Sequence, residues 1–456
     1  MMSLEVIILA AGQGSRMRSK LPKVLHPIAG KAMLKHAVDA AAATGADAIH
    51  VVIGHGADQV KSAMADSGHE LRWAMQSEQK GTGHAVAQAL PAVADDSMVL
   101  ITYGDVPLIA PETLASMLSG SERPLVLLTA TPVDPSGYGR IVRNEQGDVQ
   151  AIVEQKDASP EQLSICEVNT GIMAVSAKRL KQWLPRLSAD NAQGEYYLTD
   201  IVAMAVADGV EIAVEQPANL WEVDGVNNRQ QLNALERRYQ RNCAEQLMVE
   251  GASLADADRI DVRGTLRVGQ DVVIDVNCVF EGDVVLADGV QIGPNCHIIN
   301  SDIGENTVIR SHSVLEDAKL ADNCTVGPFA RLRPGTDLGS KARVGNFVET
   351  KNARVGVGSK INHLSYIGDA ELGDNVNIGA GTITCNYDGV NKFRTEIGNG
   401  AFIGSNTSLV APVSVGENAT VGAGSTITSA VADNELGVAR GRQRNISGWQ
   451  RPTKNS

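Results

Sequence analysis

The second half of the chain carries an apolar residue at every sixth position over long stretches. The members of these series are Val262, Val268, Ile274, Phe280, Leu286, Ile292 and Ile298; Val326, Leu332, Leu338 and Val344; and Ile397, Ile403, Leu409, Val415, Val421 and Ile427. A period of six fits neither an amphipathic helix nor a simple hairpin. It is typical of a parallel β-helix, in which each unit gives one short strand and points its apolar side chain into the core. With three units per coil, the region predicts about nine stacked coils.

The longest break in this repeat follows Ile378-Gly379, where the segment AGTITCNYDGVNKFRTE precedes Ile397. An insertion in a solenoid projects from its regular surface as a loop. Such a loop is either a tolerated surface excursion or a device that reaches a substrate or a neighbouring chain. Its tip, Asn386-Tyr387-Asp388-Gly389, favours the second interpretation.

The first half of the chain has a different pattern. The short apolar runs VIILA, AIHVVIG, MVLITYG and LVLLTAT are each followed by loop or helical sequence. This alternation predicts an α/β domain with a mainly parallel sheet. Leu232, Leu235, Tyr239 and Leu247 then recur at helical spacing. We therefore expect a first domain over residues 1–228, a linker helix over 229–250 and a β-helix domain with a basic tail over 251–456.

The charge balance narrows the possible partners. The formal net charge of −13 disfavours general binding to nucleic acid or to an anionic membrane surface, since both are polyanions. No apolar run approaches the roughly 18 residues of a membrane span, and the N-terminal run leads into a Gly-rich loop as a first strand would. The six cysteines form no CxxC pair. A cytoplasmic protein is expected.

The first strand leads into the Gly-rich turn Ala11-Gly12-Gln13-Gly14-Ser15-Arg16-Met17. The dinucleotide fingerprint fails here because its third glycine is missing, and the P-loop pattern fails because no Gly-Lys-Ser/Thr follows. Glycines still allow backbone N–H groups to approach a phosphate, and Arg16 and Lys23 add fixed positive charge. The turn therefore predicts a phosphate-binding site.

Two segments at this turn, LAAGQGSRM and LPK, closely resemble the signature of sugar-nucleotide pyrophosphorylases. The other marks of that family occur in order: Gln76, Gly81-Thr82-Gly83, Tyr103-Gly104-Asp105-Val106-Pro107, Gly137-Tyr138-Gly139-Arg140, Glu154, Asn169-Thr170-Gly171 and Val226-Asn227-Asn228. Together with the repeat, nearly the whole chain resembles the bifunctional N-acetylglucosamine-1-phosphate uridylyltransferase and glucosamine-1-phosphate N-acetyltransferase family. The resemblance implies a Rossmann-like nucleotidyltransferase domain followed by a left-handed parallel β-helix of hexapeptide repeats.

The resemblance also implies roles for residues of the first domain. The nucleotide and sugar would be held by Leu9, Ala10, Ala11, Gly12, Lys23, Gln76, Gly81, Thr82, Tyr103, Gly104, Asp105, Gly139, Glu154, Asn169 and Asn227. Arg16 and Lys23 would neutralise the triphosphate while the sugar phosphate attacks. Asp105 and Asn227 would bind Mg²⁺, for which hard oxygen donors are suited. Positioning and charge neutralisation suffice for such a displacement, without a covalent nucleophile.

For the β-helix, the resemblance implies an acetyltransferase site. His363 would be the base that takes a proton from the substrate amine, since its pKa suits that task. Arg333 and Lys351 would bind the sugar phosphate, and Tyr366 and Asn377 the sugar. The acetyl-CoA contacts would be Ala380, Asn386, Tyr387, Ser405, Ala423 and Arg440. Asn386 would help to position His363 or the acetyl group, and the Tyr387 backbone N–H could support the oxyanion. The family also implies a homotrimer whose acetyl sites are shared between chains.

The expected substrates are UTP, glucosamine-1-phosphate, N-acetylglucosamine-1-phosphate and acetyl-CoA, and the expected product is UDP-N-acetylglucosamine. Three alternatives remain open at this point. An ADP-glucose or dTDP-glucose pyrophosphorylase would share the first-half motifs. The β-helix could be a trimerisation scaffold alone. A zinc carbonic anhydrase would use His297, His312 and His363 as metal ligands, although these histidines lie at unlike phases of the repeat.

Overall fold

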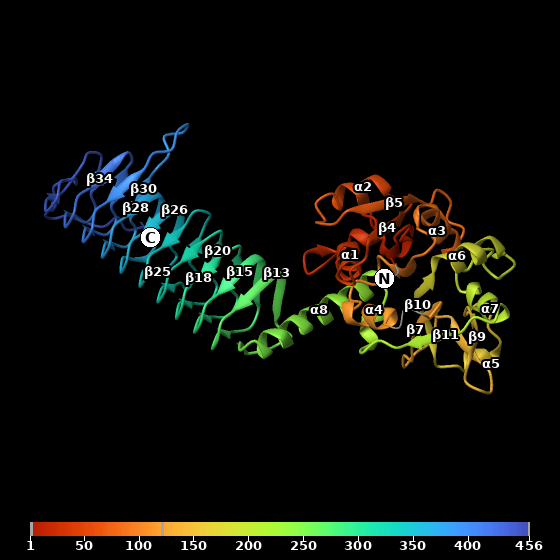
Figure 1. The fold of residues 1–456 in the computed structure, drawn as a ribbon. Coiled ribbons are helices and arrows are strands. Elements are labelled where there is room, and N and C mark those ends of the chain that lie inside the picture. Colours follow the sequence, from red (N-terminus) through yellow and green to blue (C-terminus); the bar gives the residue numbers. More distant parts are fainter. Residues whose placement is uncertain (1–2, 120–122, 455–456) are drawn as a thin grey trace. The chain divides into compact units, whose positions relative to one another are not determined.

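The computed structural model describes residues 3–119 and 123–454 (Figure 1). Contacts along the chain divide it into two compact units, Met1–Tyr239 and Gln240–Ser456. The division falls inside the long helix α8, Arg229–Val249. Among the described residues, none of the helices combines the length and hydrophobicity that crossing a bilayer requires.

The first unit is built on a mixed sheet of order β11-β7-β10-β6-β1-β4-β5, joined by the β8–β9 hairpin. The strands are β1 Leu4–Leu9, β4 Ala48–Ile53, β5 Leu71–Met75, β6 Met98–Tyr103, β7 Leu125–Ala130, β8 Arg140–Arg143, β9 Val149–Val153, β10 Val168–Ser176 and β11 Ile212–Glu215, with a separate pair of β2 Pro27–Ile28 and β3 Lys31–Ala32. All four apolar runs predicted as strands are strands: β1, β4, β6 and β7. β10 runs antiparallel to β6 and β7, and the remaining pairings of the main path are parallel.

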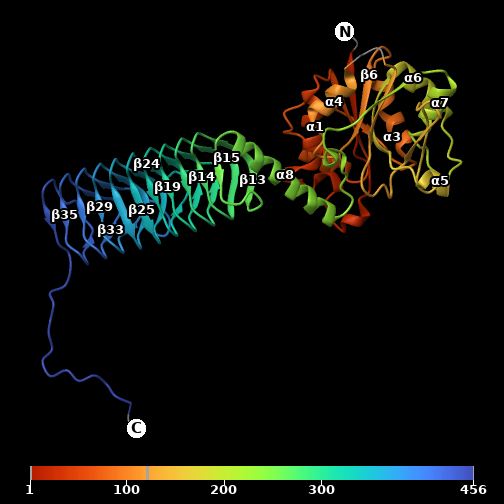
Figure 2. The same ribbon diagram turned by 90° about the horizontal axis from the view of Figure 1, so that it is seen from below.

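Helices cover both faces of this sheet (Figure 2). They are α1 Met33–Ala43, α2 Ala57–Ala63, α3 Thr82–Ala89, α4 Pro111–Leu118, α5 Pro160–Leu163, α6 Ala177–Trp183 and α7 Asp200–Ala207. The side chains of β1 alternate between the two layers, with Val6 and Ile8 in one apolar cluster and Ile7 and Leu9 in the other. Both faces of β1 are thus buried, which explains its continuous apolar sequence.

The second unit is a stack of coils, each strand pairing in parallel with its counterpart on the next coil (Figure 2). One face consists of β12 Ser253–Leu254, β14 Val273–Ile274, β16 Gln291–Ile292, β19 Val308–Ile309, β22 Thr325–Val326, β25 Arg343–Asn346, β27 Lys360–His363, β29 Asn377–Ile378, β32 Phe402–Ile403, β35 Thr420–Val421 and β37 Leu436–Gly437. These eleven strands exceed the expected nine coils. The left-handed β-helix of hexapeptide repeats is confirmed.

The other strands join into one sheet that turns the corner between the remaining faces. They are β13 Ile260–Val268, β15 Cys278–Leu286, β17 His297–Ile299, β18 Asp302–Ile303, β20 Val314–Glu316, β21 Lys319–Leu320, β23 Arg331–Leu332, β24 Asp337–Leu338, β26 Glu349–Val355, β28 Tyr366–Leu372, β30 Ile383–Cys385, β31 Thr395–Ile397, β33 Ser408–Val410, β34 Val413–Val415 and β36 Thr426–Ile427. The long strands β13, β15, β26 and β28 run through the corner without a break.

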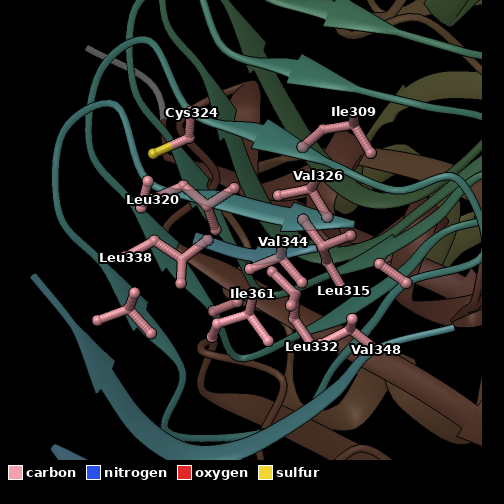
Figure 3. Packing of buried hydrophobic residues seen from close by; sticks show 14 of the residues in the cluster. Ile309, Leu315, Leu320, Cys324, Val326, Leu332, Leu338, Val344, Val348 and Ile361 are labelled. Atoms are coloured by element: carbon pink, nitrogen blue, oxygen red, sulfur yellow. The ribbon is translucent and has the colours of Figure 1, made fainter. Parts of the chain in front are cut away.

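The repeated apolar residues meet in one continuous core along the stack (Figure 3). The six-residue step shortens to five at several corners, for example between Ile298 and Ile303 and between Leu315 and Leu320, and all four side chains are buried. The shorter step explains why the sequence series stops after Ile298 and resumes in a different phase.

The inserted loop is shorter than the sequence break suggests. Thr384 occupies the inward position six residues after Ile378, and it is fully buried. Its Oγ1 accepts a hydrogen bond from Gly368 N at 2.8 Å and donates to Gly368 O at 3.0 Å, so a polar side chain is satisfied inside the core. The chain leaves the coils only after Cys385 and rejoins them at Thr395, and the loop between projects from the stack near β30 (Figure 1).

The C-terminal part of α8 closes the first coil. Ala244 and Leu247 belong to the core of the β-helix. The Gln240 side chain lies against β13: its Nε2 donates to Val262 O at 3.0 Å, and its Oε1 accepts from Val262 N at 2.7 Å. The amide of Gln240 thus supplies the hydrogen bonds that a further strand would supply at this edge.

Candidate active sites

A cavity of about 230 Å³ lies at the carboxyl ends of β1 and β6, where parallel α/β sheets bind ligands. It is lined by Leu9, Ala10, Ala11, Gly12, Lys23, Val24, Gln76, Gln79, Gly81, Thr82, Ala85, Tyr103, Asp105 and Glu195. Nine of the residues expected to hold the nucleotide therefore share one cavity with Asp105. Gln79 and Glu195 were missed from the sequence, because neither belongs to a quoted motif.

The Gly-rich turn folds closely around Lys23. Gly14 adopts φ 63°, and a Cβ at this position would lie 2.7 Å from Lys23 Cβ. Both the left-handed backbone and the close approach require glycine. The turn then continues into the short 3-10 helix Ser15–Met17, which carries Arg16. The glycine thus allows the segments bearing Arg16 and Lys23 to pack side by side.

Four side chains from three separate segments converge beside this turn. The Lys23 ammonium contacts Asp105 Oδ2 and lies 3.3 Å from Asn227 Oδ1. Arg16 Nη2 donates to the same Asn227 oxygen at 2.9 Å. A backbone bond from Val226 N to Asp105 O, 2.9 Å long, holds the two oxygen-bearing segments together. The cluster therefore combines two cations with two oxygen donors at the edge of the cavity.

Asp105 and Asn227 fit a hard divalent cation. Their Oδ atoms already face one positive charge, the Lys23 ammonium, from two sides. A carboxylate and an amide oxygen, completed by water and phosphate oxygens, form a common donor set for Mg²⁺. Within the described residues, no group of three or more His, Cys, Asp or Glu side chains is arranged to hold a metal, so the ligand itself would have to complete this site.

Gln76 and Thr82 lie where the base of a nucleotide is expected. Gln76 is buried, and its Nε2 lies 3.2 Å from Gly81 O and 3.1 Å from His84 Nδ1. Thr82 Oγ1 accepts a hydrogen bond from Leu198 N at 3.1 Å. Gly81 has φ 105°, and a Cβ there would lie 2.6 Å from Tyr196 O. The polar edge of the cavity is therefore fixed in place before any ligand arrives.

The residues expected to contact the sugar form a neighbouring group outside that lining. Asn169 N donates to Gly139 O at 2.9 Å, and a Cβ on Gly139 would lie 3.4 Å from Glu154 Oε1. Glu154 also accepts a bond from Thr199 Oγ1 at 3.1 Å, and burial raises its pKa. Tyr103 itself lines the cavity. Burial raises the pKa of its hydroxyl, and so do the charges of Asp105 and Glu154.

On the β-helix, His363 lies at the end of β27 directly beside Asn346 of β25. Their side chains meet, with Asn346 Oδ1 3.0 Å from His363 Nδ1. Asn346 was missed from the sequence. The two residues are separated by 17 positions, the distance along the chain between neighbouring coils at this point. That spacing is the signal that could have identified Asn346, once the step lengths are known.

Positive charge gathers near the inserted loop. Lys351 lies close to Lys392 of the loop, and the pKa of Lys351 is lowered first by Lys392 and then by Arg333. Arg333 is held by Glu349, with Nη1 and Oε1 2.8 Å apart. Asp369 also acts on Lys351, so the three cations have two carboxylates, Glu349 and Asp369, near them. A group with more cations than carboxylates is suited to a phosphate. Lys392 and Glu349 were both missed, since neither stands out in the repeat.

The side chain of Asn386 contacts Asp369 and Tyr366. Asn386 is buried, and its Nδ2 donates to Asp369 Oδ2 and lies 3.5 Å from Tyr366 Oη. In the described part of the chain, no hydrogen bond joins Asn386 to His363. Tyr387 next to it is 59% exposed. The arrangement favours a role for Asn386 at the Tyr366 side of the site over one in orienting the histidine.

Four of the residues expected to contact acetyl-CoA lie on successive coils: Ala380, Ser405, Ala423 and Arg440. Asn406 N, next to Ser405, donates to Ala380 O at 2.7 Å, and Gly424 N, next to Ala423, donates to Ser405 O at 2.8 Å. Arg440 continues the row, because its Nη1 donates to Ala423 O at 2.6 Å. Asn377 is placed just before this row, in β29. The row offers a continuous edge for an extended ligand.

The three histidines of the zinc alternative are not grouped. His297 bonds to Glu281 at 2.6 Å, and His312 stacks on Phe329 with ring centroids 4.8 Å apart. His363 contacts Asn346 instead. Each histidine thus has a partner of its own on a different coil, and the alternative of a three-histidine metal site is not supported by this geometry.

Comparison with known proteins finds family matches in both units. Residues 6–195 match the family described as the MobA-like NTP transferase domain, residues 262–363 the GMPPB C-terminal domain, and residues 394–429 the bacterial transferase hexapeptide (six repeats). Among solved structures, UDP-glucose pyrophosphorylase complexed with UDP-glucose aligns with 53% of this chain and 100% of that chain, at 16% identity and a TM-score of 0.44.

Curated relatives match from end to end. The bifunctional protein GlmU of Marinobacter nauticus is 64% identical over 455 residues, which cover 100% of both chains. The bifunctional protein GlmU of Cellvibrio japonicus is 60% identical over 99% of this chain and 100% of its own. With a nucleotidyltransferase domain in front and a hexapeptide transferase domain behind, this chain belongs to the family of bifunctional GlmU enzymes.

Proposed function

We propose that the chain makes UDP-N-acetylglucosamine in two steps at the two sites described above. Acetyl-CoA first acetylates glucosamine-1-phosphate on the β-helix. The first unit then transfers uridylyl from UTP to N-acetylglucosamine-1-phosphate and releases pyrophosphate. The observation that carries this proposal is the pair of candidate sites within one chain. The first unit has a cavity lined by Lys23 and Asp105, and the β-helix carries both a histidine paired with Asn346 and the cations Lys351, Lys392 and Arg333.

For uridylyl transfer, we assign the triphosphate to Arg16 and Lys23 and the uracil edge to Gln76 and Thr82. Mg²⁺ bound by Asp105 and Asn227 would neutralise charge on the reacting phosphates. Lys23 and Arg16 would bind the oxygens of the leaving pyrophosphate, and Glu154 and Asn169, with Gly139, would orient the sugar so that its phosphate faces the α-phosphorus. Because the reaction is a displacement between phosphates, the protein contributes position and positive charge.

For acetyl transfer, His363 is proposed as the base. Asn346 Oδ1 accepts from Nδ1, which leaves Nε2 with a lone pair to take a proton from the substrate amine. The amine then attacks the thioester carbonyl, and CoA leaves as the thiol. Arg333 and Lys351 hold the sugar phosphate, while Tyr366 and Asn377 bind the sugar. Ala380, Ser405, Ala423 and Arg440 receive the CoA, with Asn386 and the Tyr387 N–H near the acetyl group.

The proposed assembly is a homotrimer in the cytoplasm, with UTP, acetyl-CoA and the two sugar phosphates as its partners. A stripe of exposed apolar side chains at one corner of the coils supports self-association. Phe329, Phe347 and Leu364 are 46%, 56% and 62% exposed, and the two phenylalanine rings stack at 5.3 Å. Apolar groups gathered in this way favour burial against another chain.

The decisive experiment incubates the pure protein with glucosamine-1-phosphate, acetyl-CoA, UTP and Mg²⁺, and identifies the product by mass. UDP-N-acetylglucosamine is expected. Omitting acetyl-CoA should stop its formation, and supplying N-acetylglucosamine-1-phosphate should restore it. In parallel reactions, ATP or dTTP replaces UTP. A sugar nucleotide formed with either of these but not with UTP would favour another sugar-nucleotide pyrophosphorylase. Uridylyl transfer without any acetyl transfer would reduce the β-helix to a scaffold.

A further inference from the structure

The side-chain oxygens of Asp105 and Asn227, the proposed metal ligands, both face the ammonium group of Lys23. The Lys23 ammonium contacts Asp105 Oδ2 and approaches Asn227 Oδ1 to 3.3 Å. The two charged side chains are 12% and 19% exposed, so water covers little of either. A carboxylate this enclosed needs a positive partner, and Lys23 provides it.

We propose that Lys23 acts as a placeholder for the divalent cation and excludes it until the nucleotide arrives. This inference rests on the proposed function, because it uses Asp105 and Asn227 as the metal ligands. The ammonium and a divalent cation cannot bind the same two oxygens at once, because two positive charges so close together repel each other strongly. Arg16 strengthens the exclusion, with its guanidinium 2.9 Å from Asn227 Oδ1.

The nucleotide would reverse this balance. A triphosphate offers Lys23 and Arg16 several anionic oxygens at once, more than Asp105 and Asn227 offer together. Both cations can then turn from the metal ligands to the phosphates, and the freed oxygens can accept a metal. The free enzyme should therefore bind divalent metal weakly, and metal and nucleotide should enter the site together. Lys23 would thus couple the two binding events.

The test measures Mn²⁺ binding to the free, full-length protein by electron paramagnetic resonance, without nucleotide. Lys23→Met keeps the length of the side chain and removes its charge, so it should bind Mn²⁺ at least about tenfold tighter than the parent. Lys23→Met with Asp105→Asn should lose that gain. Lys20→Met, at an exposed position of the same loop, removes an equal charge and should leave the affinity for Mn²⁺ unchanged.

Melting temperatures supply a second readout. Mn²⁺ should raise the melting temperature of Lys23→Met more than that of the parent, because the metal replaces the lost ammonium beside Asp105. If Lys23→Met does not fold, Lys23→Gln, which keeps a donor for Asp105, should give the same tightening. Equal Mn²⁺ affinity in the parent and in the folded Lys23 variant would overturn the proposal, as would a gain that persists with Asp105→Asn. These measurements use no nucleotide, so their failure differs from the absence of uridylyl transfer, which would overturn the proposed function.

Discussion

The Oδ1 atom of Asn346 lies 3.0 Å from Nδ1 of His363, on the neighbouring coil of the β-helix. A carbonyl oxygen can only accept, so this contact fixes the proton on Nδ1 and leaves Nε2 as the basic nitrogen. Asn346→Ala should therefore slow acetyl transfer about tenfold and shift its pH profile, since second partners of this kind orient a working imidazole. Asn295→Ala removes a similar corner contact on a distant coil and should leave the rate unchanged. Equal rates and pH profiles for Asn346→Ala and the parent would contradict the role.

His363→Ala should reduce the rate of acetyl transfer by about 10²- to 10⁴-fold, the usual effect of losing a general base. Raising the pH should restore part of the activity, because more of the substrate amine is then neutral without help. Uridylyl transfer, glucosamine-1-phosphate affinity and oligomer mass should stay at parental values. A folded, trimeric variant with near-parental acetyl transfer would remove His363 from the mechanism.

Asp105→Ala should abolish uridylyl transfer, with a loss of about 10²-fold or more, since a metal ligand and the partner of Lys23 disappear together. Acetyl transfer should be spared, because the residues assigned to it all lie in the other unit. The two half-reactions are measured separately on the same preparation. Equal loss of both in a folded variant would contradict the assignment of two independent sites.

Burial raises the pKa of Glu154, so the folded state disfavours the charged carboxylate. Glu154→Gln should raise the melting temperature where the parental carboxylate is ionised in both states, at about pH 8. The pKa of Glu154 is raised in the folded state and is about 4.3 in the unfolded state. Once the pH falls below both pKa values, the carboxyl is protonated in both states, and the variant should melt at the same temperature as the parent. Glu145→Gln, at an exposed position, serves as the control. A constant difference across this range would refute the pH dependence.

Thr384→Val should destabilise the second unit by about 1–3 kcal/mol, because the buried Gly368 N–H would lose its acceptor. Thr384→Ser keeps the hydroxyl and should cost less. Chemical denaturation followed by circular dichroism compares the variants. If Val is tolerated as well as Ser, the hydroxyl contributes nothing to the core.

The repeat was readable in the sequence because Leu, Ile and Val mark inward positions directly. The inward position of Thr384 could not be predicted in this way, because threonine more often faces solvent. The sequence therefore suggested that the loop begins directly after Gly379, whereas the chain leaves the coils only after Cys385. The antiparallel direction of β10 was also hidden, because the side chains of a buried strand do not reveal its orientation.

The candidate sites divide along similar lines. The residues of the first cavity are grouped in motifs at strand ends, so a resemblance was enough to predict them, and their individual roles stay predictions. The sequence did not predict Asn346, Glu349 and Lys392 as site residues. Each contacts its partner only because coils stack on one another or because of the path that the loop takes. Whether two residues on neighbouring coils meet depends on steps of five or six, and these become known only from the structure.

Gln240 gives the β-helix a defined beginning. Its amide occupies the backbone groups of Val262 to which a strand from another molecule would otherwise add. Fibre-like growth from this end is thereby blocked by a single side chain and the helix that carries it. A duplicated coil in the middle of the stack would leave the contact between Gln240 and Val262 in place. The stack could therefore lengthen, in evolution or by engineering, without exposing a strand edge at which other molecules could polymerise.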